Sequence, residues 1–540
     1  MNVFFCYVAF GATHSPHQAP SSYIDKYKGK YDEGWDVIRQ KWYEKQLDLR
    51  VIPSEAELSP RNRGVEPWEE LSEEQKALYA KMQEVFAAFL DHTDDQVGRL
   101  IEFLETQDLL DDTLIVFLSD NGASQEGGKH GTTNELAYFN LMPLQVDDMI
   151  QHLDEIGGPN YYNNYPWGWS QVGNTPLRFY KQNTYEGGIR DPLIMHWPNG
   201  IDDAGGIRDQ YHHVIDLMPT ILDIVGVESP ENFQGVDQQP VEGTSMRYTF
   251  PANAVDTPTT RPKQYYEMMG HRAIWSDGWK AVTMHRKGVP FEDEEWALYD
   301  TSKDFSECHD LSASEPEKLK EMIDLWWDEA ESFNVLPLDD RGNELFFMRR
   351  EDRLPLSKPQ RFLKNTPHLE RFKIPDVRNR SFEIGAKVAL DRDSEGVLVA
   401  SGGRTGGIVL YVANSHLVFE YNFMGSSTIV SSERKLDTGE CELGVSYRKT
   451  AENHGTASLY IENKDNRDYL GEIEIDTLPY RQTMYGMDVG KDLGPTVSDK
   501  YVGPFTFTGN LEWIEFRLEN DRDDLEVASA VEAKNALADQ

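Results

Sequence analysis

The stretch Thr113-Leu114-Ile115-Val116-Phe117-Leu118-Ser119-Asp120-Asn121-Gly122 decides the fold class of this chain. It begins with an apolar run that predicts a strand buried on both faces. A long helical pattern precedes this strand, and a polar loop comes after it. Helix, buried strand and polar loop are together one unit of a doubly wound α/β domain. Ligands bind beyond the carboxyl ends of strands in such domains, so the loop at Asp120 and Asn121 is a candidate site.

The helix before this strand has a clear start signal. Ser72 and Gln75 can form a capping box, and apolar residues then recur at helical spacing: Leu78, Met82, Val85, Phe86, Phe89, Val97, Leu100, Ile101 and Leu104. Downstream, residues 216–225 predict a helix with Pro219 in its first turn. Residues 265–300 alternate apolar and polar side chains, which predicts a small antiparallel sheet.

The first residues also predict a strand. Residues 3–10 are apolar and run into a turn-rich loop, residues 11–20, that contains His14 and His17. We expect a buried strand of a parallel sheet here, because no basic leader of a signal peptide precedes the apolar run. A fold seldom starts in its own core, so we expect the chain to be truncated at its N-terminus.

The second half of the chain has a different pattern. Residues 341–380 are rich in Pro, Arg and Asp and predict a linker after an α/β domain at 1–340. Residues 381–520 contain apolar strands separated by turns, which predicts an all-β sandwich domain. Residues 521–540 form an acidic, Ala-rich tail.

Composition excludes several classes of partner. The net charge is −40, from 93 acidic and 53 basic residues, and such a surface repels nucleic acid. The sequence has no run of about 18 apolar residues that would span a membrane. Cys6, Cys308 and Cys441 lie far apart and lack metal-ligand spacing, so we expect ordinary packed thiols.

Four residues are candidates for chemistry, each with an ordinary alternative. Asp120 and Asn121 offer oxygen ligands to Ca²⁺ or Mg²⁺, although Asp-Asn-Gly is also a common turn sequence. His14 could protonate a leaving oxygen or bind an anion, or it could simply bond a loop carbonyl. Lys181 precedes a Gly pair and could approach an anionic group, or it could be a surface lysine.

Their order along the chain resembles that of the sulfatase family. The resemblance covers roughly residues 1–340 and rests on five collinear segments: residues 10–20 with His14, residues 118–122 with Asp120 and Asn121, residues 173–188 with Lys181, residues 216–220, and residues 296–311. Residues 381–520 are similar, more weakly, to the extra C-terminal domain of long bacterial arylsulfatases.

The resemblance implies an alkaline-phosphatase-like α/β core that hydrolyses sulfate esters. It also implies a Ca²⁺ (or Mg²⁺) ion on Asp120 and Asn121, catalytic roles for His14 and Lys181, and a formylglycine nucleophile made from Cys-x-Pro/Ala-x-Arg. None of the three Cys has that motif, no Ser variant of it occurs, and the family's paired N-terminal Asp ligands are absent. We therefore expect both to lie upstream of residue 1, and this fragment alone to be inactive.

Two other functions stay open. One is a phosphatase or phosphonate hydrolase of the same superfamily, because such enzymes share the metal loop. The other is a non-catalytic chain whose β domain binds glycans, with Tyr411, Phe419 and Tyr421 either stacking on sugars or packing in the core. For a sulfatase, the expected substrate is a sulfate ester of a small molecule or a glycan. The sequence indicates neither compartment nor oligomeric state.

Overall fold

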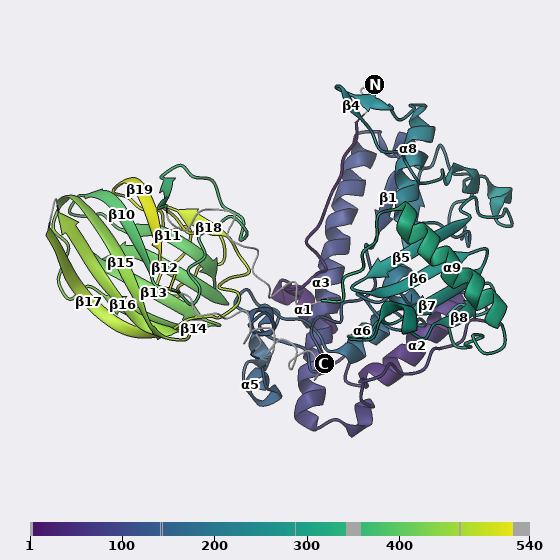
Figure 1. Ribbon diagram of the computed structural model, residues 1–540, viewed down its shortest axis with the longest axis horizontal. Coiled ribbons are helices and arrows are strands. Elements are labelled where there is room, and N and C mark those ends of the chain that lie inside the picture. The colour runs from purple at the N-terminus through teal and green to yellow at the C-terminus, as the bar shows by residue number, and fades with distance from the viewer. Residues whose placement is uncertain are drawn as a thin grey trace.

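The computed structural model describes residues 4–140, 142, 144–286, 288–341, 358–463 and 466–521. Figure 1 shows two lobes, a mixed α/β lobe built from residues before 341 and an all-β lobe built from residues after 358. This confirms the predicted order of an α/β part followed by an all-β part. Among the described residues, no helix is both long enough and apolar enough to cross a membrane.

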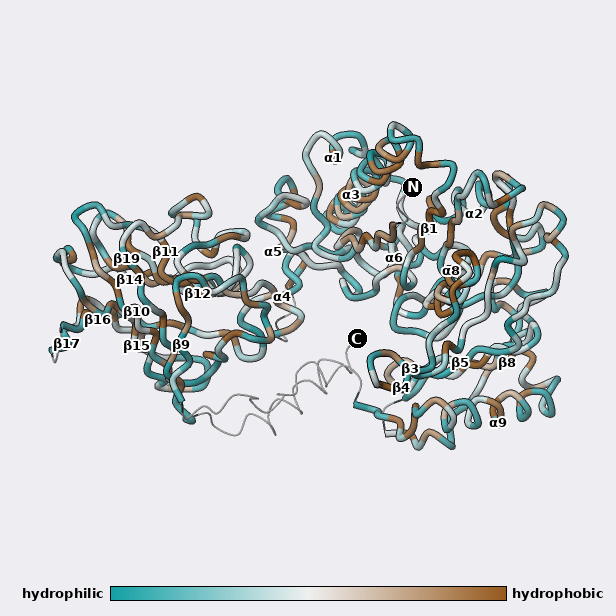
Figure 2. Tube along the Cα trace, turned by 90° about the horizontal axis from the view of Figure 1, so that it is seen from above, coloured by the Kyte–Doolittle hydropathy of each residue, from teal (hydrophilic) through white to brown (hydrophobic). Residues whose placement is uncertain are grey.

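The α/β lobe is organised around one long helix, α3 (Glu73–Thr106), which begins at the predicted capping box of Ser72 and Gln75. Its apolar face joins a core with Trp35, Trp68 and Trp169, and Figure 2 shows hydrophobic segments recurring along it. The other helices in this part of the lobe are α1 (Ser21–Tyr27), α2 (Gly34–Leu49), α4 (Glu135–Tyr138), α5 (Val146–Ile150), α6 (Trp167–Gly173) and α7 (Glu186–Ile189).

Two predictions about strands are wrong. Residues 4–10 form no strand and are exposed, with Phe5 76% and Tyr7 84% accessible. Strand β1 (Ile115–Leu118) exists, but it pairs antiparallel with β2 (Leu193–His196) in a two-stranded sheet rather than in a parallel one. No further strand among the described residues pairs with this sheet, and side chains such as Phe117 are therefore exposed.

The predicted small antiparallel sheet is confirmed. It has the order β5 (Lys263–Met268), β6 (His271–Ser276), β7 (Trp279–Thr283) and β8 (Ala297–Asp300). Helix α9 (Pro316–Ser332) covers one face, where Met322 and Trp326 are fully buried. Helix α8 (Leu217–Val225) confirms the helix predicted for residues 216–225, and a short hairpin comes after it, β3 (Asn232–Phe233) with β4 (Val236–Asp237).

The all-β lobe is a sandwich of two antiparallel sheets with one apolar core between them. The six-stranded sheet has the order β17 (Asn466–Asp476), β16 (His454–Asn463), β15 (Gly439–Ala451), β10 (Phe382–Leu390), β19 (Asn510–Leu518) and β9 (Gln360–Leu363). The five-stranded sheet has the order β14 (Ser426–Ser431), β13 (His416–Phe423), β12 (Gly406–Ala413), β11 (Gly396–Gly403) and β18 (Met487–Val489).

The sandwich begins inside the predicted linker. Strand β9 lies within the stretch 341–380 and pairs with β19, so the all-β lobe starts earlier in the chain than residue 381. Residues 342–357 and the predicted tail after residue 521 lie outside the described residues.

Candidate functional site

The loop that carries His14 is held against the segment around Asn163. The Ser15 hydroxyl and the His17 amide both donate to the Asn163 carbonyl, at 3.0 and 2.9 Å. Nδ1 of His14 lies 2.9 Å from the Ser15 carbonyl oxygen, which accepts only from a protonated nitrogen. Nε2 of His14 is thereby left to face the other site residues.

The loops of Asp120 and Lys181 are bound to each other through Asn174. Its side chain accepts from the Ala123 amide at 2.9 Å and donates to the Phe179 carbonyl at 2.9 Å. The backbone amide of Lys181 donates to the Ala123 carbonyl at 3.1 Å. Two segments that the sequence analysis singled out separately are therefore one structural unit.

Glycines permit this close approach. A Cβ atom on Gly122 would lie 1.8 Å from the Gly187 carbonyl oxygen, far inside van der Waals contact. A Cβ atom on Gly187 would in turn lie 2.2 Å from the Arg178 carbonyl oxygen. Backbone packs on backbone here, which explains why the metal-loop candidate and the Gly-Gly segment both need residues without side chains.

A buried network of charged side chains supports the segment that contains Gly187 and Gly188. Lys280, fully buried on β7, lies 2.8 Å from a carboxylate oxygen of Glu186 and 2.8 Å from one of Glu307. Glu307 also accepts a hydrogen bond from the Glu186 amide at 2.8 Å. The small sheet therefore fixes the position of α7 and, through it, the loop of Asp120.

The structure brings the two predicted catalytic residues together. Nζ of Lys181 lies 3.2 Å from Nε2 of His14 and 3.1 Å from Oε2 of Glu126. The distance from Nε2 of His14 to the same Glu126 oxygen is 3.4 Å. Sequence reasoning missed Glu126, because it lies in an irregular loop where no spacing rule marks it.

These contacts shift two pKa values. The hydrogen bond with Glu126 raises the pKa of His14 above its usual value, although burial opposes this. Burial alone would raise the pKa of Glu126, but His14 and Lys181 outweigh it and lower the value to about 2. The cluster is thus an ionised carboxylate that holds a lysine and a readily protonated histidine at an accessible surface.

Asp120 and Asn121 lie at the end of β1, with Asp120 exposed and the Asn121 amide donating to the Gly122 carbonyl at 3.1 Å. Sequence reasoning missed Asp191, whose pKa is raised to about 7 by burial and by the negative charges of Asp120 and Glu186. Carboxylate and amide oxygens are the donor type that hard cations such as Ca²⁺ or Mg²⁺ prefer. Within the described ranges, no group of three or more His, Cys, Asp or Glu side chains could hold a metal ion.

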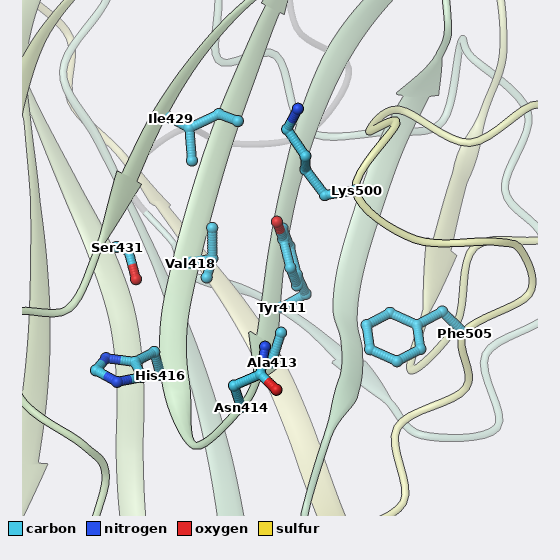
Figure 3. A pocket seen from close by; sticks show the side chains of 9 residues that line it. All are labelled: Tyr411, Ala413, Asn414, His416, Val418, Ile429, Ser431, Lys500 and Phe505. Carbon is cyan, nitrogen blue, oxygen red and sulfur yellow. The ribbon is translucent and has the colours of Figure 1, made fainter.

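The aromatic residues considered for glycan stacking are buried. Tyr411, Phe419 and Tyr421 are only 4%, 1% and 3% exposed. Tyr411 nevertheless lines a cavity of about 390 Å³ in the sandwich, and Figure 3 shows it with the side chains of Lys500 and Phe505. The three thiols are free, as expected, but Cys6 is exposed rather than packed.

Comparison with protein families gives two matches. The family described as sulfatase matches residues 2–227. The family described as N-sulphoglucosamine sulphohydrolase, C-terminal, matches residues 177–331. Together they span the α/β lobe, including His14, Asp120, Asn121 and Lys181, and end before the β-sandwich.

Known proteins give a consistent result. An uncharacterised sulfatase from Schizosaccharomyces pombe is 35% identical over 342 residues, covering 62% of this chain and 59% of the relative. An arylsulfatase from Klebsiella aerogenes is 29% identical, covering 46% and 52%, and an N-acetylgalactosamine-6-sulfatase from Sus scrofa is 26% identical, covering 37% and 30%. The chain thus spans less than two thirds of the length of these relatives. From the five collinear segments, the geometry of their side chains and these matches, we conclude that the chain belongs to the sulfatase family.

Proposed function

We propose that this protein hydrolyses sulfate monoesters at the cluster of His14, Glu126 and Lys181. The observation that carries the proposal is the convergence of the three polar groups within 3.4 Å. They come from segments that match the sulfatase family. A cation beside a proton donor is what cleavage of an anionic ester requires. When His14 is protonated the cluster is positive, which locally offsets the net charge of −40 that otherwise repels sulfate.

Each member of the cluster has a role in this proposal. The Lys181 ammonium offsets negative charge on the sulfate oxygens. His14, whose Nδ1 is bonded to the Ser15 carbonyl, donates the proton on Nε2 to the departing alcohol oxygen. In its neutral form, Nε2 instead accepts from Lys181. Glu126 stabilises the protonated form of His14 and orients both cations.

Asp120 and Asn121 would hold a Ca²⁺ or Mg²⁺ ion, which when bound supplies positive charge to the sulfate oxygens. The charge of Asp120 acts on Asp191, which is therefore the carboxylate to test as a further ligand. The proposal also requires a nucleophile that the 540 residues do not supply, because none of the three Cys has the formylglycine motif. A substrate that is either a small-molecule or a glycan sulfate ester fits this chemistry.

The test is hydrolysis of 4-nitrophenyl sulfate by the protein in its natural full length. Lys181→Ala and Asp120→Ala should each lower turnover by roughly 10²–10⁴-fold. Lys303→Ala, which removes an exposed lysine of the same lobe, is the matched control. Turnover close to wild type in either site variant would contradict the proposal. Preference for 4-nitrophenyl phosphate in competition would instead favour the phosphatase alternative.

The β-sandwich supports saccharide binding as a second candidate function. Its cavity combines an aromatic wall, Tyr411 and Phe505, with polar groups at His416 and Lys500 (Figure 3). Apolar surface with a few polar groups is typical of small-ligand sites. Retention of the protein on immobilised saccharides, and its loss in His416→Ala, would support this function. Equal retention of wild type and variant would contradict it.

A further inference from the structure

Both oxygens of the Glu126 carboxylate are hydrogen-bonded. Lys181 and His14 share Oε2, at 3.1 and 3.4 Å. Oε1 accepts instead from Nε2 of Gln182, at 3.1 Å. The Ser124 hydroxyl lies 3.2 Å from Oε2. Because Gln182 and Ser124 are uncharged, they can fix the orientation of the carboxylate without changing the net charge of the cluster.

The direction of the Ser124 hydrogen bond follows from its other partners. The Ser124 hydroxyl oxygen accepts from the Glu126 amide at 3.1 Å and from Nδ2 of Asn164 at 3.4 Å. A hydroxyl has two acceptor sites and one proton, so the proton points to Oε2 of Glu126. Asn164 is itself fixed, because its side-chain oxygen accepts from the Tyr165 amide at 2.9 Å and the residue is fully buried.

Gln182 is also held at both ends of its amide. Nε2 donates to Glu126, while Oε1 accepts from Nε2 of Gln125 at 3.2 Å. These two bonds leave the Gln182 amide one orientation. The Trp167 indole donates to the Gln125 carbonyl at 2.9 Å, which ties this residue to the start of α6. The carboxylate is therefore connected to two separate parts of the framework.

The backbone of Gln182 is strained. Its φ is +71°, in the left-handed region that residues with a Cβ atom rarely adopt. Consecutive side chains of an extended segment point to opposite sides, yet Lys181 and Gln182 both bind one carboxylate. Glycine would adopt this conformation without strain but would provide no amide. Strain that coincides with such a contact indicates a functional constraint on the side chain.

The two uncharged residues determine which oxygen faces the cations. Rotation of the Glu126 carboxylate would break the bonds from Gln182 and Ser124 together. Oε2 is thereby kept beside Nζ of Lys181 and Nε2 of His14, which are 3.2 Å apart. A general acid works only when it is held within hydrogen-bond reach of the leaving oxygen, and a small displacement lowers the rate.

We propose that Gln182 and Ser124 are positioning residues for the Glu126 carboxylate. They hold one of its oxygens beside His14 and Lys181, where it serves both side chains. The inference rests on the proposed function and deepens it, because it names two groups outside the reacting cluster on which proton transfer from His14 depends. Both act on the reaction through Glu126, as residues that support a reacting group do.

The test is an NMR titration of the His14 ring in the full 540-residue chain, with His14→Gln to identify its signals. Gln182→Gly removes the amide and should unfold at a temperature close to that of the wild type, because glycine adopts the positive φ without strain. The pKa of His14 should fall toward 6.5, by less than in Glu126→Gln. An unchanged pKa would overturn the proposal. So would a raised pKa, because loss of a donor alone makes the carboxylate more basic and strengthens its bond to His14.

Gln234→Gly is the matched control. Gln234 is exposed, with a φ of +51° in the turn between β3 and β4, so the same side chain is removed from the same kind of backbone position. It should leave the pKa of His14 unchanged. Ser124→Ala is the second variant and should lower this pKa as Gln182→Gly does. His17 and Glu135, whose charges also act on His14, are kept in all variants.

Hydrolysis by the protein in its natural full length gives a second readout. An alkyl sulfate releases an alcohol that needs a proton to depart, whereas 4-nitrophenolate leaves readily without one. Gln182→Gly should therefore lower kcat about tenfold or more for the alkyl ester, less for 4-nitrophenyl sulfate, and change KM far less. Equal losses for the two esters would contradict a role in proton transfer.

The two proposals fail separately. If the pKa of His14 falls in Gln182→Gly but the wild type hydrolyses no sulfate ester, the proposed function fails and the positioning of Glu126 stands. If the wild type hydrolyses sulfate esters and Gln182→Gly keeps both its kcat and its His14 titration, the positioning alone is overturned.

Discussion

Nζ of Lys181 lies 3.2 Å from Nε2 of His14, although the two residues are 167 positions apart in the chain. Neither side chain is placed by a regular element. The His14 loop is bonded to Asn163, and Lys181 is bonded through its amide to Ala123. Backbone hydrogen bonds between loops therefore create the site, and Glu126 joins the two cations within it.

The shared carboxylate gives a first prediction. Glu126→Gln removes the hydrogen-bonded negative charge that raises the pKa of His14, so this pKa should fall toward 6.5. The pKa of His14 is higher in the folded protein than in the unfolded chain, so protonated His14 stabilises the fold. This stabilisation is fully present below about pH 6.5 and is lost as the pH rises through the folded pKa. The measurement is an NMR titration of the His14 ring.

A matched control exists in the same lobe. His309 is paired with Glu57 at 2.8 Å on the surface, and this bond raises the pKa of His309. Glu57→Gln should lower the pKa of His309 and leave that of His14 unchanged. If the pKa of His14 is the same in Glu126→Gln as in the wild type, the Glu126 carboxylate does not stabilise the protonated form of His14.

Local patterns in the sequence predicted the elements whose signals are local. The capping box at Ser72, the helix at residues 217–225 and the small sheet at 263–300 depend on neighbouring residues. The environment of residues 4–10 and 113–118 was predicted wrongly, because burial depends on which other strands are present. An apolar run indicates a capacity for burial and cannot specify its partners.

The residues of the candidate site were likewise predicted only where a sequence motif marks them. His14 and Lys181 were predicted from motif order, and the structure places them in contact. Glu126 and Asp191 were not predicted, because their roles depend on loops that meet only in the folded chain. Asn140 donates to the Arg481 carbonyl across the junction of the two lobes, a contact that no spacing rule within one lobe can detect.

The backbone contact between Gly122 and Gly187 gives a second prediction. A Cβ atom at Gly122 would meet a carbonyl oxygen at 1.8 Å, so Gly122→Ala must displace the loop of Asp120. We expect a loss of about 1–3 kcal/mol in the free energy of unfolding. Weaker Ca²⁺ binding should accompany it, measured by calorimetry and by thermal unfolding with and without the ion.

Gly98→Ala is its control, because no atom lies within 4 Å of the added Cβ and the residue is in the interior of α3. Alanine should stabilise that helix by roughly 0.5–1 kcal/mol. If Gly122→Ala is as well tolerated as Gly98→Ala, the loop contact does not constrain the metal candidate.

The buried lysine under α7 gives a third prediction. Lys280→Met leaves the carboxylates of Glu186 and Glu307 buried without the cation between them. We expect a cost of about 3–5 kcal/mol, measured by urea unfolding. Lys303→Met, at an exposed pair with Asp300, should cost roughly 1 kcal/mol or less. Equal effects of the two substitutions would exclude the buried network as the support of α7.

Asp216, which precedes α8, and Asp223, which lies within it, allow a buried and an exposed aspartate to be compared in the last prediction. Asp216 is fully buried and bonded to Arg261 and His212, whereas Asp223 pairs with Arg247 at the surface. Burial raises the pKa of Asp216, but the bonds from His212 and Arg261 outweigh it and lower the pKa well below its usual range. Asp216→Asn should therefore destabilise the protein by several kcal/mol, about 3–5 at neutral pH, and Asp223→Asn by about 1 or less.

The pH dependence identifies the cause of that difference. A depressed folded pKa stabilises the protein above the unfolded value of about 3.9, and this contribution is lost as the pH falls through the folded pKa. The gap in unfolding free energy between wild type and Asp216→Asn should thus narrow below about pH 4, while the Asp223→Asn gap changes little. A gap that stays constant from about pH 7 to about pH 3 would mean that packing around Asp216, rather than its charge, holds the start of α8 in place.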